Sequence, residues 1–356
     1  HLRFPEFTGE WNFEPLDTIA PNITSGKSKP AVGQYDLYGS TGIIGKTSTA
    51  DYSGDMLLVA RVGANAGTLQ LVNGICGITD NTLIIKPRKL SSRYLHFYLQ
   101  HYNLNRLIFG SGQPLITAGM LKKVHIPFGK PLEQYKIEIL LNLIAERITA
   151  QNKIIEKLET LIKGIVDLSY DNSVTTKKLG NVIAQISQRN KSGKEMVVLS
   201  VNNKQGFIEQ SEQFEERIIA SDDTSNYKMV CINDFAYNPA RINVGSIARL
   251  KDKECGIVSP MYICFRTLGN MLPEYLELFF KTKRFALDVD KRLEGSVRLC
   301  LSYEGLCEIA IPIIAIEKQK TLVEKIASLY SKLDIEKKFL RNYKMQKQYL
   351  LSQMFI

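Results

Sequence analysis

The stretches 132–166 and 317–356 repeat apolar side chains at alternating spacings of four and three residues. This heptad pattern predicts two long amphipathic helices whose apolar seams pack together. In the first stretch the seam positions are Ile137, Leu141, Ile144, Ile148, Ile155, Leu158, Ile162 and Ile165, with Gln151 filling one slot. In the second stretch the same slots hold Leu322, Ile326, Leu329, Leu333, Leu340, Tyr343 and Leu350, with Glu336 in place of Gln151 and Lys347 breaking the seam.

An internal repeat relates the two halves of the chain at an offset of 185 positions. The pairs that align without a gap are Gly110-Ser111 with Gly295-Ser296, Leu121 with Leu306, Val124-His125-Ile126-Pro127 with Ile309-Ala310-Ile311-Pro312, and Gln134 with Gln319. A weaker echo relates residues 61–67 to 241–245, and Cys76-Gly77-Ile78 to Cys255-Gly256-Ile257. Self-similarity of this kind indicates a duplicated unit. We therefore expect a globular segment over 1–131, a helix over 132–166, a second globular segment over 167–316 and a second helix over 317–356.

A pseudo-two-fold relation between the halves requires the two predicted helices to run antiparallel. The expected fold class is α/β (α+β), with two globular copies separated by two long antiparallel coiled-coil helices. A helix of about 33 residues is roughly 50 Å long, which matches about 15 base pairs of duplex DNA. A duplex also has local two-fold axes, so a pseudo-symmetric protein suits two separated half-sites.

Composition favours an acidic partner and argues against a membrane protein. The formal net charge is +10, which is typical of proteins that bind nucleic acid. The longest apolar stretch, 309–316, contains Pro312 and is far too short to span a bilayer. The chain begins without Met, so we expect His1 to mark a processed or engineered end.

The cysteines show no metal-binding pattern. They have no C-x-x-C spacing and no histidine nearby, so we expect no zinc site and free, buried thiols in a reducing, cytoplasmic compartment. The six positions are Cys76, Cys231, Cys255, Cys264, Cys300 and Cys307.

Basic side chains are distributed unevenly. Residues 1–131 carry 13 basic and 8 acidic side chains, whereas 167–316 carry 19 of each. An acidic ligand of the second globular segment must therefore meet a local patch, and the candidates are 189–194, 249–253 and 281–284.

The string YGSTGIIGKT, residues 38–47, resembles a phosphate-binding loop at first sight. Gly45-Lys46-Thr47 supplies the end of the G-x-x-x-x-G-K-[ST] motif, but Ser40 stands where its first glycine is needed. That glycine lets the backbone turn its N–H groups toward phosphate oxygens. We therefore set the NTPase interpretation aside and predict a glycine-rich turn between two strands.

No catalytic constellation is evident, and we expect no enzyme activity, cofactor or metal. Tyr237-Asn238-Pro239-Ala240 lacks the second proline and the aromatic of a methyltransferase base clamp, so we interpret it as a turn. The acidic pairs Glu215-Glu216 and Asp222-Asp223 lie in a polar stretch that is more typical of a solvated surface than of a Mg²⁺ site. His96 and His101 fall in a predicted helix, SRYLHFYLQHY, where a core or boundary role is favoured over catalysis.

The order of parts and several local strings resemble the specificity subunit of type I restriction–modification systems. The strings are LRFPEFTGEW near the start, YGSTGIIG, ARVGANAG, SGQPLI at 111–116, and the Ile-Pro pairs at 126–127 and 311–312. The second half departs from the pattern, with GSVRLCLS at 295–302 where the first has GSGQPLIT. The resemblance implies two target recognition domains on a helical spacer that docks methyltransferase subunits. It also implies a bipartite target in double-stranded DNA, two modification (methyltransferase) subunits and two restriction (motor-nuclease) subunits.

DNA contacts need donors at phosphates and Arg, Lys, Asn or Gln at base edges. In the first globular segment we expect them from Lys27, Lys29, Ser40, Lys46, Arg61, Asn65 and Gln113. In the second we expect them from Arg189, Asn190, Lys191, Asn203, Lys204, Arg241, Asn243 and Arg298. The main alternative is a coiled-coil interaction scaffold that binds no nucleic acid.

Overall fold

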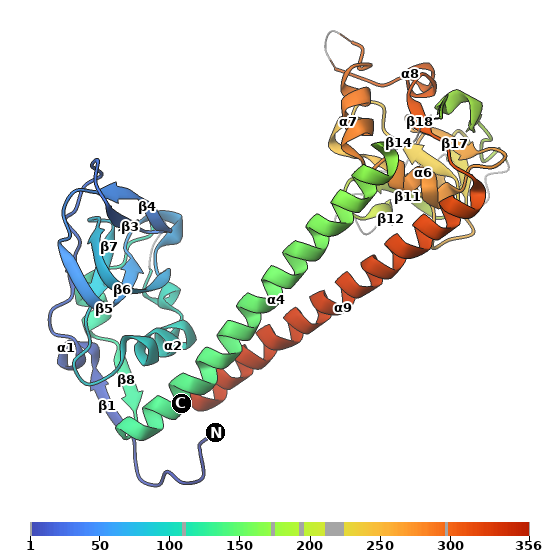
Figure 1. Cartoon of the computed structure of the whole chain (residues 1–356). Coiled ribbons are helices and arrows are strands. Elements are labelled where there is room, and N and C mark those ends of the chain that lie inside the picture. The colour runs from blue at the N-terminus through green and yellow to red at the C-terminus, as the bar shows by residue number, and fades with distance from the viewer. Residues whose placement is uncertain are drawn as a thin grey trace. The chain divides into compact units, whose positions relative to one another are not determined.

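The chain has a mixed α/β fold in which two compact units are distinguished by their contacts. The computed structural model describes residues 2–108, 112–171, 175–191, 196–210, 224–295 and 298–355. Unit 1 consists of His1–Lys153 together with Lys337–Ile356, and unit 2 consists of Ile154–Glu336. Each unit thus combines one globular segment with parts of both long helices, which are labelled α4 and α9 in Figure 1.

The centre of unit 1 is a six-stranded sheet of order β2-β7-β5-β6-β3-β4. Along β5, Leu57 and Val59 enter the core formed with the helices, whereas Met56 and Leu58 enter a second cluster on the other face. Both faces are therefore buried, which explains the uninterrupted apolar run of this strand. The strands are β2 (Thr24–Ser25), β3 (Tyr35–Gly39), β4 (Gly42–Thr47), β5 (Tyr52–Ala60), β6 (Leu69–Ile78) and β7 (Thr82–Ile85).

Helices and a two-stranded sheet complete the core of unit 1. Helix α2 spans Ser92–Tyr102, as predicted, and the side chain of Ser91 caps it by accepting a hydrogen bond from the N–H of Tyr94. The other elements are β1 (Asn12–Pro15), α1 (Leu16–Ile19), the 3-10 helices η1 (Gly63–Asn65) and η2 (Leu104–Leu107), α3 (Ala118–Lys122) and β8 (His125–Phe128), which pairs with β1.

Unit 2 contains two four-stranded sheets, of order β10-β17-β14-β15 and β12-β11-β16-β13, and the pair β9–β18. In its core the rings of Phe235 and Phe265 stack with centroids 5.1 Å apart. The strands are β9 (Thr176–Lys178), β10 (Ile183–Ile186), β11 (Val198–Asn202), β12 (Gly206–Glu209), β13 (Lys228–Cys231), β14 (Phe235–Tyr237), β15 (Ile247–Arg249), β16 (Cys255–Val258), β17 (Ile263–Thr267) and β18 (Ala310–Pro312). The helices are η3 (Leu179–Asn181), η4 (Ile242–Val244), α6 (Pro273–Phe279), α7 (Lys283–Asp290) and α8 (Tyr303–Cys307).

Both predicted long helices are present, as α4 (Pro131–Asp171) and α9 (Ile316–Met354). Every seam position predicted from the heptads is buried or half-buried, including Gln151 and Glu336. In unit 1, Ile137 near the start of α4 shares a core with Phe355, directly after the end of α9.

Helix α4 continues five residues beyond its predicted end at residue 166. The extension brings the fully buried ring of Tyr170 to 4.8 Å from that of Tyr275 and 5.4 Å from that of Phe279. The Tyr170 hydroxyl also donates a hydrogen bond to the carbonyl of Tyr275. Packing against the globular segment, which the heptads cannot reveal, therefore determines where this helix ends.

The internal repeat recurs as equivalent contacts within the two units. Tyr94 donates a hydrogen bond from its hydroxyl to the carbonyl of Pro127, and Tyr275 does the same to Pro312. The Tyr94 ring packs edge-on against Phe355, and the Tyr275 ring packs against Tyr170 at the equivalent place, in a tilted arrangement. Pro312 and Phe355 follow Pro127 and Tyr170 at the repeat offset of 185 positions.

Further contacts repeat at the same offset around the start of each long helix. The buried side chain of Gln134 donates to the carbonyl of Gly129, and that of Gln319 donates to Ile314. Thr117 and Ser302 both cap short helices through their hydroxyls. The repeated frame thus depends mainly on bonds to backbone carbonyls and N–H groups, which tolerate sequence change in the strands.

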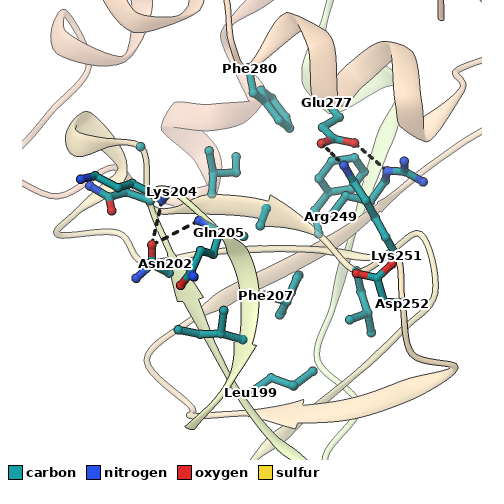
Figure 2. Close-up of a pocket in the computed structure, with 18 of the residues that line it drawn as sticks. Leu199, Asn202, Lys204, Gln205, Phe207, Arg249, Lys251, Asp252, Glu277 and Phe280 are labelled. Carbon is teal, nitrogen blue, oxygen red and sulfur yellow. Dashed lines mark hydrogen bonds and ion pairs between the residues drawn. The ribbon is translucent and has the colours of Figure 1, made fainter. Parts of the chain in front are cut away.

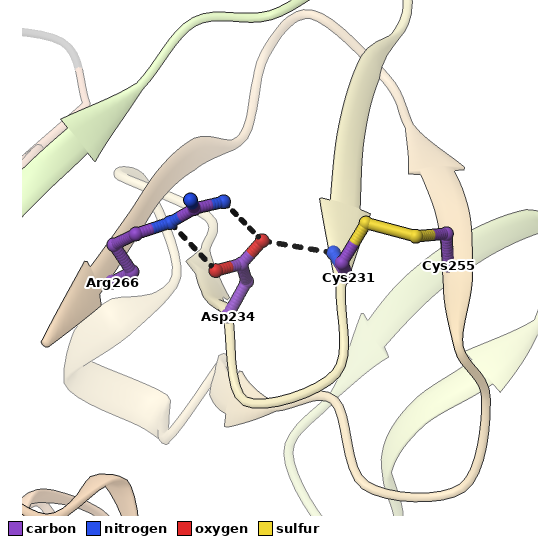
Figure 3. Close-up of a disulfide and its surroundings, with 4 residues drawn as sticks. All are labelled: Cys231, Asp234, Cys255 and Arg266. Carbon is purple, nitrogen blue, oxygen red and sulfur yellow. Dashed lines mark hydrogen bonds and ion pairs between the residues drawn. A yellow bond between two sulfur atoms is a disulfide. The ribbon is translucent and has the colours of Figure 1, made fainter.

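The expectation that all cysteines are free thiols is wrong for one pair. Cys231 on β13 and Cys255 on β16 lie directly opposite each other in the antiparallel register and form a disulfide (Figure 3). Beside it, the carboxylate of Asp234 accepts a bond from the N–H of Cys231 and pairs with Arg266. No spacing of cysteines along the chain indicated this pairing, because it arises from the register of two strands. Cys76, Cys264, Cys300 and Cys307 are free.

Replacing Tyr170 by alanine is expected to destabilise unit 2 by about 3 to 5 kcal/mol, as for other buried aromatic side chains. Leu168→Ala is the matched control, since Leu168 is 60% exposed on the same turn and should change stability by less than about 0.5 kcal/mol. Hydrogen exchange of the amides of β14 and β17 reports on unit 2. Equal protection in the two variants would contradict the anchoring role of Tyr170.

His96 is half-buried in α2, in line with the expected core or boundary role, and should make the stability of unit 1 depend on pH. Burial, with the nearby charges of Lys347 and Arg93, lowers the pKa of His96 from 6.5 to about 4. The unfolded chain therefore takes up this proton first, and stability should fall by about 3 kcal/mol as pH drops from 6.5 to 4. His96→Gln should remove most of this dependence in unfolding curves followed through fluorescence of the single tryptophan, Trp11, in unit 1. If the stability of the variant and of the parent chain depended on pH in the same way, His96 would not be the source of this dependence.

Candidate nucleic-acid interface

The string YGSTGIIGKT forms the predicted strand–turn–strand. Strands β3 and β4 pair through Tyr38 with Ile43 and through Gly39 with Gly42, which leaves Ser40 and Thr41 at the turn. Gly42 has a φ of +114°, a conformation that L side chains rarely adopt. Lys46 lies within β4 and pairs with Asp36 at 2.7 Å. A phosphate-binding loop would lead into a helix, so the strand at this place excludes the NTPase interpretation.

A second loop lies beside the hairpin of unit 1 and carries two of the predicted DNA contacts, Arg61 and Asn65. The side chain of Gln70, at the start of β6, donates to the carbonyl of Gly39 in the hairpin. The 3-10 helix η1 leads into this strand and contains Asn65. Gly63 of η1 donates its N–H to Pro114, so the loop containing Gln113 packs on η1. Ser40, Arg61, Asn65 and Gln113 thus occur on adjoining turns.

Within this group Arg61 has an unusual environment. Its Nε is buried and has no hydrogen-bond partner among the residues that the structure describes. Its backbone is fixed by bonds with Asn81 and Ile116. A guanidinium that is held at its base can still donate to a ligand through its terminal nitrogens.

Lys27 and Lys29 are exposed at a different place in unit 1. They line an open cavity of about 530 Å³ together with Ser48, Thr49 and Asp51. Lys46 is on β4 near this end of the hairpin, one residue before the cavity-lining Thr47. Ammonium and hydroxyl groups in this arrangement can donate to phosphate oxygens.

Unit 2 contains an equivalent hairpin with a different turn. Asn202 accepts bonds from the N–H groups of Lys204 and Gln205 through its side-chain oxygen, which directs a tight turn between β11 and β12. In both units the first strand of the hairpin pairs in parallel with a later strand, β3 with β6 and β11 with β16. The strings 76–78 and 255–257 lie on these later strands, so their weak similarity has a structural counterpart.

The hairpin tip of unit 2 meets the 3-10 helix η4. A Cβ on Gly245, the residue after η4, would be 3.7 Å from the Cβ of Asn203. The hydroxyl of Ser246 donates to the carbonyl of Val201. Four predicted contacts, Asn203, Lys204, Arg241 and Asn243, therefore gather on these two turns, and all four are exposed.

The remaining predicted residues of unit 2 lie elsewhere. Residues 189–191 are next to the start of β13, at the opposite edge of the sheet from β12. Arg189 donates to the side chain of Asn226, Lys191 is exposed, and Asn190 is only 1% exposed, so Asn190 can support this edge but not touch a base. Arg298 is exposed beside the bridge between Glu294 and Cys300. The acidic pairs at 215–216 and 222–223 lie outside the described residues.

A cavity of about 550 Å³ in unit 2 joins two of the predicted basic patches (Figure 2). It is lined by the hairpin residues 202–209, by the stretch 247–253 and by Glu277, Phe280 and Lys281 of the α6 region. Glu277 had not been singled out from the sequence. The sequence signal that could have pointed to an acidic partner here was the alternation of Arg249, Lys251 and Lys253. In an extended segment, this spacing places cationic side chains on the same side.

The chemistry of these surfaces suits recognition by hydrogen bonds and charge. Tyr237-Asn238-Pro239-Ala240 forms the predicted turn, since Asn238 accepts a bond from the N–H of Ala240. Within the described ranges, no group of three or more His, Cys, Asp or Glu side chains could hold a metal ion. Over the same residues, no helix combines the length and apolar character needed to cross a membrane.

Comparison with known proteins agrees with the resemblance seen in the sequence. Residues 17–160 match the family model of the type I restriction modification DNA specificity domain. The specificity subunit of the type I restriction enzyme EcoprrI from Escherichia coli is 25% identical over 167 residues, which are 46% of this chain and 37% of that protein. The matched stretch is thus well under half of that relative's length.

Two solved structures share the fold over nearly the whole chain. The S subunit of a type I restriction–modification system from M. genitalium superposes with a TM-score of 0.64 at 16% identity, covering 100% of this chain and 98% of that one. A chain from a study of complex assembly and conformational transition of the type I R-M system gives 0.57 at 14% identity, covering 98% of each. The chain is therefore similar, in sequence and in fold, to type I restriction–modification specificity subunits.

Proposed function

We propose that this chain is the DNA sequence-specificity subunit of a type I restriction–modification complex, in which each globular segment reads one half of a bipartite duplex target. The observation that carries the proposal is the recurrence of one frame with two different loop sets. Tyr94 and Tyr275 hold equivalent strands in the two units, whereas the hairpin tips differ. Two domains with the same core contacts but different polar loops can each recognise a different DNA sequence.

The exposed loops supply the donors that such reading needs. Asn203, Arg241 and Asn243 in unit 2, and Asn65 and Gln113 in unit 1, carry amides or a guanidinium at the surface. Amide side chains can bond adenine and guanidinium groups can bond guanine in the major groove. Lys27, Lys29 and Lys204 would contact phosphates and fix the register on the duplex.

The long helices would set the distance between the half-sites. Helix α4 has 41 residues, which corresponds to about 60 Å of helix. Gln151 and Glu336 occupy the same slot of their heptads, where a polar pair would favour one alignment of the seams over slipped ones. The proposed domain limits are 1–131 and 167–316 for the two readers, with the helices between and after them.

The outer face of α4 suits the docking of partner subunits. Leu143, Ile154, Leu161 and Leu168 are between 42% and 60% exposed and recur at spacings compatible with one heptad face. Exposed apolar side chains in a row are typical of a protein interface. We assign this face to two methyltransferase subunits, with two motor-nuclease subunits completing the complex. The chain itself would then contribute no catalytic group.

Mapping of methylated adenines tests the proposal directly. The chain is co-expressed with its modification subunit in a host without other adenine methylation, and methylated positions are read across the genome. We expect one motif with two specified halves and an unspecified gap. A continuous motif would contradict the bipartite interpretation. Methylation that requires the modification subunit but not this chain would support the scaffold alternative.

Lengthening both helices should lengthen the gap. Four residues added after Gln151 and four after Glu336 lengthen both helices at the same heptad slot by about one turn, which adds roughly 6 Å, or about two base pairs. We expect both half-sites to be retained, with a central gap longer by about one or two base pairs. Four residues inserted at Gly269 are the control, because this turn is open and a Cβ there would have no heavy atom within 4 Å. An unchanged gap with full methylation would show that the helices do not set the spacing.

A further inference from the structure

One half-buried carboxylate in unit 2 forms ion pairs with three cationic side chains. Glu277 accepts ion pairs from Lys251 at 2.6 Å, from Arg249 at 3.0 Å and from Lys281 at 3.5 Å. Arg249 also pairs with Glu274 at 2.6 Å. Figure 2 shows Glu277 above the stretch that carries Arg249 and Lys251, at one wall of the cavity. We call Arg249, Lys251, Lys281 and Glu277 the Glu277 cluster.

The members of the Glu277 cluster differ in their access to solvent. Glu277 and Arg249 have side chains that are 17% and 11% exposed, so they form the base of the cluster. The side chains of Lys251 and Lys281 are both 45% exposed. The ammonium of Lys281 also lies 5.0 Å from the centre of the Tyr330 ring. Glu277 thus holds the two lysines in place, and almost half of each lysine side chain remains accessible to a ligand.

Glu277 keeps its charge in this environment. Burial alone would raise its pKa, but Lys281, Lys251 and Arg249 together hold the pKa below its ordinary value. The carboxylate is therefore ionised at neutral pH and fixes the lysines in place. Cations that are already ordered lose less conformational entropy when they bind an anion.

The cavity beside the cluster retains positive charge. Five cationic and three acidic side chains are among the described residues that line it. Lys204 at the hairpin tip has no ion pair within the described part of the chain, while Lys253 pairs with Glu209. Phe207, Phe235 and Phe280 provide an apolar lining, which strengthens electrostatic attraction close to it. A small anion is therefore the kind of ligand that would neutralise the excess positive charge of this cavity.

We propose that the Glu277 cluster binds a backbone phosphate of the DNA duplex through Lys251 and Lys281. This rests on the proposed function, because the same cavity is bordered by the hairpin tip that we assign to base reading. The second globular segment has no net charge, so its hold on DNA has to come from such a local site. The cluster fixes the position of the duplex against Asn203 and Lys204 and carries no sequence information itself.

The test uses the whole chain in complex with its modification subunit and a duplex that contains the mapped motif. The variant Lys251→Gln/Lys281→Gln removes both ammonium groups. We expect the slope of log K against log salt to become shallower by about one. Binding should weaken to a similar extent on target and non-target duplexes, and the methylated motif should stay the same.

Two control variants separate this role from effects on folding. Lys178→Gln removes an exposed lysine that is also paired with a carboxylate, Glu308, in the same unit, and should leave the slope unchanged. Lys251→Arg/Lys281→Arg keeps the charges and should retain the slope. All variants are compared by thermal unfolding, so that a loss of binding can be separated from a loss of structure.

Neutral methylphosphonate linkages locate the contact. Placed one at a time along the duplex, one linkage on the side read by unit 2 should weaken the parent complex and have little effect on the double glutamine variant. Equal slopes for the parent and that variant would overturn the inference and leave the proposed function standing. A changed motif in the variant would also overturn it, since the lysines would then be reading bases. Failure of the parent complex to bind any DNA specifically would instead refute the proposed function.

Discussion

The structure depends on one kind of contact, in which an aromatic ring at the C-terminal end of a long helix packs on a tyrosine of a globular segment. Phe355 follows α9 and meets Tyr94 in unit 1, and Tyr170 near the end of α4 meets Tyr275 in unit 2. All four rings are almost fully buried. The hydroxyls of Tyr94 and Tyr275 also donate to the carbonyls of Pro127 on β8 and Pro312 on β18, which ties these strands to the same cores. The last turn of each helix is therefore part of a core rather than a frayed end.

The sequence predicted the features that have a period or a local signature. The heptads identified both long helices, the repeat identified equivalent halves, and glycine spacing identified the hairpin at 38–47. Helix α2 spans the same residues as the string SRYLHFYLQHY that was predicted to be helical. The heptads and the glycine spacing are local signals, and the repeat is found by aligning the chain with itself, so a single sequence is enough to detect them.

The features that were missed depend on contacts between distant residues. Cys231 and Cys255 meet because two strands adopt one register, and Arg249 meets Glu277 across 28 positions of chain. Asn190 was predicted to donate to DNA, but it is only 1% exposed, and its backbone N–H donates to the carbonyl of Tyr227. Polar residue type alone does not distinguish a side chain that faces solvent from one that supports a sheet edge.

The division of the chain between its units affects the order in which they can be completed during synthesis. Unit 2 is one continuous stretch, Ile154–Glu336, whereas unit 1 joins the first 153 residues to Lys337–Ile356. Domains usually fold in the order in which they leave the ribosome. Here the sheet of unit 1 emerges first but lacks Met354 and Phe355 from its core until the last of these residues is made. All residues of unit 2 have been synthesised before the last residues of unit 1. Unit 1 therefore begins to emerge before unit 2 but can complete its core only after unit 2.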